Sequence, residues 1–100
     1  MLENNRSSKS LALELGISLL SWRKARTLFK TLLKHPLWNN QRSPHSLMID
    51  CLYLVVRKEG YPLTINNFKQ ATVNLFGIST QPRPSDWSKT YQFIIDEVLD

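Results

Sequence analysis

The side chains best suited to binding a ligand lie in residues 23–42. This segment carries six cationic side chains and no acidic one: Arg23, Lys24, Arg26, Lys30, Lys34 and Arg42. Residues 1–50 hold eight Lys or Arg against three Asp or Glu, whereas residues 51–100 hold five of each. The net charge of +5 therefore arises in the first half. An excess of positive charge of this kind creates an electrostatic field that attracts polyanions, nucleic acid above all.

The six cations, together with Arg83 and Lys89, are the predicted nucleic-acid contacts. Lys and Arg on one helical face would bind the DNA backbone by releasing counterions from phosphates. The alternative is that these cations form only the solvated, charged face that many exposed helices have.

Other chemistry finds little support in this sequence. It has no glycine-rich phosphate loop and no Ser/His/Asp pattern, and His35, His45 and Cys51 do not form a metal-ligand set. We therefore expect no enzyme, no cofactor and no metal site. Cys51 is expected to be a buried thiol, and a single cysteine favours a reducing intracellular compartment. No run approaches the roughly 20 apolar residues of a membrane span.

The elements that must position these side chains are helices, because five helical patterns and no convincing strand occur. The patterns run from Ser8 or Ser10 to Gly16, from about 19 to 35, over about 44–59, from a cap at Thr64 to Gly77, and from near Ser85 to the end. Residues 1–9 are predicted to be a polar tail and residues 10–100 a single all-α domain.

The third helix is expected to be the central one. Ser43 can cap it, Pro44 suits its first position and Gly60 stops it. Because it is apolar on nearly every side, it belongs inside a bundle. Asp50 within it must then face water or pair with a basic residue, since burial alone is costly.

Aromatic residues are expected mainly in the core. Trp22 lies on the apolar stripe of the second helix, and Trp87 and Tyr91 on that of the fifth. Trp38 follows Pro36 in a turn, so it either packs inside or stacks on a partner.

Several short motifs, taken in order over residues 10–98, resemble one cyclin-like repeat of the transcription factor IIB superfamily. Arg42-Ser43-Pro44-His45-Ser46-Leu47 is similar to the Gly-Arg-Ser-Pro-x-Ser start of the family's third helix, and Leu52-Tyr53-Leu54 to its Ile-Tyr-Leu. Phe76-Gly77-Ile78-Ser79 resembles its Gly-Val-Ser turn, and Lys89-Thr90-Tyr91 its final Arg-x-x-Tyr helix.

The resemblance implies a five-helix cyclin-like bundle that binds DNA and scaffolds a transcription initiation complex. Its partners would be double-stranded DNA and initiation proteins such as a TATA-binding protein, in the nucleus if the source is a eukaryote. The last two helices would form a helix-turn-helix whose second member opens near Asp86.

The sequence also departs from the family pattern. Met48, Ile49, Asp50 and Cys51 replace the usual alanines, and residues 80–84 lengthen the turn before the last helix. Ser88 stands where base-reading members place arginine. Two other functions stay open: a cyclin fold that grips a partner helix or acidic segment without DNA, including a replication-origin subunit, and a small structural subunit whose charge aids solubility.

Overall fold

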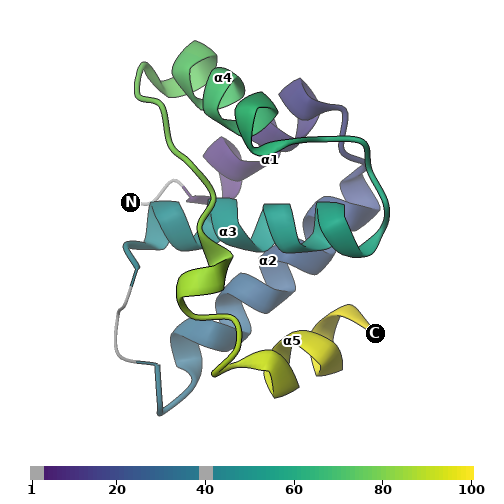
Figure 1. Ribbon diagram of the computed structural model, residues 1–100, viewed down its shortest axis with the longest axis vertical. Coiled ribbons are helices and arrows are strands. Elements are labelled where there is room, and N and C mark those ends of the chain that lie inside the picture. The colour runs from purple at the N-terminus through teal and green to yellow at the C-terminus, as the bar shows by residue number, and fades with distance from the viewer. Residues whose placement is uncertain (1–3, 39–41) are drawn as a thin grey trace.

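The structure is a computed structural model, and it describes residues 4–38 and 42–100, with side chains from residue 7 onward. Its elements are α1 (Asn4–Leu15), α2 (Leu19–Lys34), α3 (Pro44–Lys58), α4 (Ile65–Phe76), the 3₁₀ turn η1 (Pro84–Asp86) and α5 (Gln92–Leu99). No strand occurs in these residues, so the prediction of an all-α chain with five helices is confirmed (Figure 1). The Cα radius of gyration, 12.4 Å, is that of a compact body of this length.

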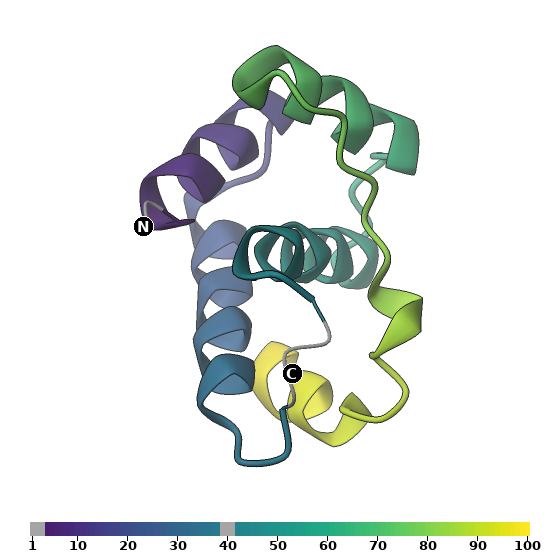
Figure 2. The same cartoon turned by 90° about the vertical axis from the view of Figure 1, so that its left-hand side faces the viewer.

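Helix α3 lies in the middle of the molecule, as its apolar sequence predicts. Figure 2 looks nearly along α3 and shows the other helices around it. Ser43 caps the helix by accepting a hydrogen bond from the Ser46 amide, and Pro44 occupies the first turn, where no amide donor is needed. Its side chains are buried along most of its length, including Leu47, Cys51, Leu52, Val55 and Val56.

The other helices divide into two groups around α3. Helix α2 packs against α3 on one side and also contacts α5, whereas α4 packs against α1. Both views place α4 and α5 at opposite ends of the molecule (Figures 1 and 2).

Helix α1 begins earlier than the sequence pattern suggests. The predicted tail over residues 1–9 is wrong for residues 4–9, which are helical; residues 1–3 lie outside the described residues. Burial explains the longer helix, because the Ser8 hydroxyl is enclosed and accepts a hydrogen bond from Trp22 Nε1 at 2.9 Å. A polar sequence thus became helical by docking on α2.

The segment between α4 and α5, residues 77–91, crosses α3 as an irregular connection, which we call the strap. Gly77 starts it with φ of 77°, a left-handed conformation that ends α4 as predicted. Figure 1 shows the strap running down across α3 from α4 to α5. The predicted fifth helix from Ser85 is wrong in its start, since α5 begins only at Gln92. The predicted helix-turn-helix is also wrong, because the strap separates the two helices by far more than a 3–4-residue turn.

No helix in the described ranges, 4–38 and 42–100, has the length and apolarity that crossing a bilayer requires.

Candidate nucleic-acid interface

Four of the predicted cations lie along the outward face of α2. The helix buries Trp22, Ala25, Leu28, Phe29 and Leu32 against the core. At 100° per residue, Arg23, Arg26, Lys30 and Lys34 fall together on another face. Arg23, Lys30 and Lys34 are exposed and Arg26 is half-buried. We call these four residues the α2 ridge; it extends for about 16 Å, long enough to meet several phosphates.

Trp22 anchors the first part of this ridge. The Arg26 guanidinium lies 5.6 Å from the centre of the Trp22 ring and the Lys9 ammonium 5.8 Å from it, both within cation–π range. Lys9 was not among the predicted contacts, because its segment was assigned to a polar tail. Only the packing of α1 on α2 brings this extra charge to the ridge.

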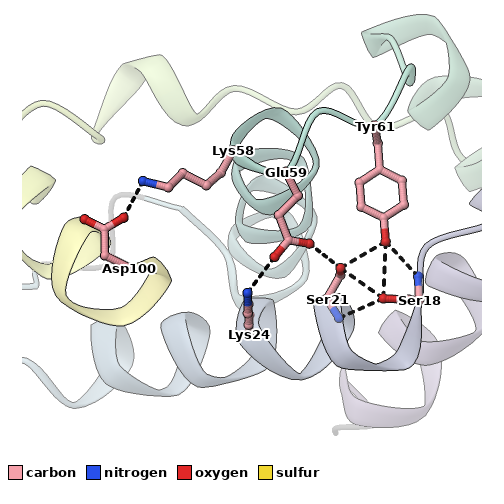
Figure 3. A network of polar contacts seen from close by, with 7 residues as sticks. All are labelled: Ser18, Ser21, Lys24, Lys58, Glu59, Tyr61 and Asp100. Carbon is pink, nitrogen blue, oxygen red and sulfur yellow. Dashed lines mark hydrogen bonds and ion pairs between the residues drawn. The ribbon is translucent and has the colours of Figure 1, made fainter.

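Lys24, in contrast, is paired within the protein. Its Nζ lies 2.7 Å from Glu59 Oε2, at the carboxyl end of α3. Glu59 also accepts a hydrogen bond from the Ser21 hydroxyl, and Ser21 and Ser18 in turn contact the Tyr61 hydroxyl (Figure 3). The network joins the start of α2 to the end of α3, so Lys24 has a structural partner.

Two groups in this network titrate away from their ordinary values. The hydrogen bonds from Lys24 and then Ser21 lower the pKa of the Glu59 carboxyl, because they favour its ionised form. Hydrogen bonds from Ser18 and Ser21 lower the pKa of the Tyr61 hydroxyl for the same reason. The network therefore stabilises the charged carboxylate at neutral pH.

Arg42 is also paired, with the buried Asp50. Its Nε lies 2.9 Å from Asp50 Oδ2 and its Nη2 3.0 Å from Oδ1, a two-point contact. The strap supplies two further donors: the Arg83 amide at 2.9 Å and Trp87 Nε1 at 2.8 Å. Asp50 is fully buried, so of the two predicted alternatives, exposure to water or pairing with a basic residue, the structure shows the pairing.

We call Asp50 and these three partners the Asp50 hub. It places Arg42 between segments of the protein, with a side chain only 16% exposed. The guanidinium that the sequence suggested for DNA instead compensates an interior carboxylate.

Arg83 and Lys89 lie on the strap, which the structure does not bring onto the α2 ridge. Figure 2 shows the strap and α2 on different sides of α3. Arg83 Nε is 3.2 Å from Asp86 Oδ2 in an exposed pair, and Lys89 is exposed in the turn before α5. The predicted set of eight cations thus splits between two surfaces and the interior.

The aromatic predictions concern the core and are confirmed for Trp22, Trp87 and Tyr91, which are buried. Trp38 is buried as well, 5.6 Å from the Trp87 ring and 5.1 Å from the Tyr91 ring. The packing alternative for Trp38 is therefore right.

Cys51 is buried as expected, and burial raises the pKa of its thiol. It therefore stays protonated and unreactive at neutral pH. Within the described residues no three His, Cys, Asp or Glu side chains gather into a metal-ligating group.

Comparisons of the chain with protein-family models, with curated proteins and with solved structures find no match. The candidate interface therefore depends on its own geometry and charge.

Proposed function

We propose that this protein is a cyclin-like, DNA-binding and scaffolding module of a transcription initiation complex, and that it holds the backbone of duplex DNA through the α2 ridge. The observation that carries the proposal is the ridge itself: four cations on one outward helix face, with the Lys9 ammonium beside it. A TATA-binding protein or a similar initiation protein would be the neighbour that such a module scaffolds.

Three of the four ridge cations, Arg23, Lys30 and Lys34, are exposed and differ from Lys24 and Arg42 in being available to a ligand. In the described part of the chain, Arg23, Lys30 and Lys34 form no ion pair with an acidic side chain. Unpaired exposed cations neutralise phosphate without first breaking an internal contact, and each one releases condensed counterions. The binding is sequence-independent, as backbone contacts are.

The cyclin-like part of the proposal is supported by the central α3 with its Ser43-Pro44 start and by the order of the helices around it. Because the strap separates α4 from α5, these two helices do not form the helix-turn-helix that would read bases. The proposed role is thus confined to the DNA backbone.

The test is a titration of a fluorescent 20-base-pair duplex of mixed sequence with the whole chain at two salt concentrations. The double variant Lys30→Glu with Lys34→Glu should lose most of the affinity for the duplex, because repulsion replaces two phosphate contacts. The slope of log K against log salt should fall by about 2, since each phosphate contact contributes about 0.9.

The matched control is Lys69→Glu with Lys89→Glu, which changes the net charge equally on α4 and on the strap, away from the ridge. It should keep most of the affinity for the duplex. Equal losses of duplex affinity in the two variants would contradict the proposal that the ridge binds DNA. They would show that only the net charge matters.

A protein-binding role is the second candidate, and one exposed apolar pair favours it. Leu37 and Phe93 are 70% and 58% exposed, and the Phe93 ring packs edge-on against His35 at 5.8 Å. Leu37→Ser with Phe93→Ser should leave duplex binding intact. A loss of duplex affinity in that variant would instead assign the pair to the DNA-binding surface.

A further inference from the structure

A concave surface unrelated to the α2 ridge lies between α3 and the strap. It encloses about 550 Å³, and its walls include Tyr53, Leu54, Arg57, Ile65, Pro82 and Arg83. This volume is in the range of about 300–1,000 Å³ typical of small-ligand sites. The lining combines aliphatic side chains with two guanidinium groups and the carboxylate of Asp86.

The first guanidinium is held in a fixed position by its own helix. Arg57 lies 5.7 Å from the centre of the Tyr53 ring, and its Nη1 donates to the Tyr53 hydroxyl at 3.2 Å. Tyr53 is buried and packs edge-on against Phe68 at 5.4 Å. Because Tyr53 is rigidly packed, Arg57 presents a planar cation to the groove, and planar cations stack well on aromatic rings.

The second guanidinium belongs to Arg83, whose backbone is tied to the Asp50 hub. Its side chain forms an ion pair with Asp86 at 3.2 Å, and the two side chains are 59% and 46% exposed. An exposed pair of this kind is weak. A phosphate group forms charge-assisted, often two-point bonds with arginine, so it can compete with this weak exposed pair for the Arg83 guanidinium.

We propose that this groove binds one nucleotide of a single-stranded nucleic acid, with its base stacked on Arg57 and its phosphate paired with Arg83. Leu54, Ile65 and Pro82 supply the apolar walls that a base requires. Bases within a duplex are already stacked on both faces, so the site selects an unpaired strand. This site is independent of the α2 ridge, which contacts only phosphates.

The test compares two fluorescent probes on the full chain in 50 mM salt: a twelve-nucleotide oligothymidylate and an abasic oligomer with the same number of phosphates. Oligothymidylate should bind at least about five-fold more tightly, because base stacking contributes a factor of about 5 or more per base. Arg57→Lys keeps the charge but loses the plane, so it should remove most of this difference.

Asp86→Asn provides a gain in binding that a merely misfolded protein cannot give. It frees Arg83 and removes a negative charge, so both probes should bind about two- to five-fold more tightly. Arg83→Gln should weaken both probes to a similar extent. Thermal unfolding of each variant, monitored by circular dichroism, establishes that the protein measured is folded.

The ridge variant Lys30→Glu with Lys34→Glu separates this site from the proposed duplex contact. It should keep the preference for oligothymidylate over the abasic oligomer. Equal affinity for the two probes, or an Arg57→Lys variant that behaves like the parent, would overturn the proposal. Tighter binding of a polyglutamate peptide, lost in the Arg57 and Arg83 variants, would reassign the groove to acidic peptides. None of these outcomes affects the duplex titration.

Discussion

The α2 ridge and the Asp50 hub make opposite use of the same kind of residue. Lys34 and Arg42 are eight positions apart in one acid-free stretch, yet Lys34 is exposed on the last turn of α2 and Arg42 is clamped to a buried carboxylate. The difference is set by Asp50, which pairs with Arg42, whereas Lys34 forms no ion pair with an acidic side chain among the described residues. A cation in a sequence is thus available to a ligand only if folding leaves it without an acidic partner.

The largest expected effect concerns the hub. Arg42→Ala should lower the free energy of unfolding by about 3–5 kcal/mol, because it leaves the Asp50 carboxylate buried without a compensating charge. Urea denaturation followed by tryptophan fluorescence measures this loss, since Trp87 donates directly to Asp50.

The matched control for that change is Lys34→Ala on the ridge. It should alter the unfolding free energy by less than about 0.5 kcal/mol, as exposed substitutions usually do. Similar losses of unfolding free energy in Arg42→Ala and Lys34→Ala would contradict the view that Arg42 is structural and Lys34 is not.

A smaller effect is expected at the upper anchor of the strap. The Thr72 hydroxyl is fully buried, donates to the Lys69 carbonyl and accepts from the Thr80 amide at 2.9 Å. Thr72→Val keeps the shape but removes this acceptor, so it should cost about 1–3 kcal/mol. Hydrogen exchange should become faster at the Thr80 amide than at the Arg83 amide, which keeps its Asp50 partner. Equal protection of the Thr80 amide in parent and variant would contradict the anchor.

The smallest effect concerns the Glu59 network of Figure 3. Glu59→Gln removes the Lys24 pair and should cost less than about 1 kcal/mol at pH 7, because the pair is partly exposed and screened. It should also free Lys24, and a modest gain in duplex affinity would show that this cation can join the ridge.

The loss of unfolding free energy in Glu59→Gln depends on pH, and the direction of this dependence follows from the pKa of Glu59. Folding lowers the pKa of Glu59, so its contribution is complete above the unfolded value of about 4.3 and disappears as the pH falls through the folded pKa. The difference in unfolding free energy between parent and Glu59→Gln should therefore shrink on acidification below about pH 4.3. A difference that grows towards acid pH would show that the carboxylate is not the stabilising form.

Local chemistry made several features of the fold predictable. Ser43 and Thr64 are N-caps, and Gly77 is a left-handed C-cap, because each role needs only a hydroxyl or a missing Cβ at one position. The inner stripe of α2 was predictable for the same kind of reason, since a period of 3.6 residues fixes which side chains share a face.

The last third of the chain shows where such reasoning stops. Trp87 and Tyr91 have the spacing of a helical stripe with Ile94 and Ile95, but they precede α5. Trp87 Nε1 bonds to Asp50, and the Tyr91 hydroxyl donates to the Leu37 carbonyl at 2.7 Å. Long-range hydrogen bonds of this kind override local helical periodicity.

The sequence alone predicts an all-α chain with a central helix over about residues 44–59 and a positively charged second helix, because periodicity, caps and charge density are local properties. Tertiary structure decided that α1 starts at Asn4, that Lys9 lies over the Trp22 ring beside the α2 ridge, and that Arg42 pairs with a buried carboxylate. These outcomes depend on which groups meet when the helices and the connecting segments pack together. A buried carboxylate such as Asp50 selects its partners by the cost of leaving it unpaired, and no local pattern encodes that choice.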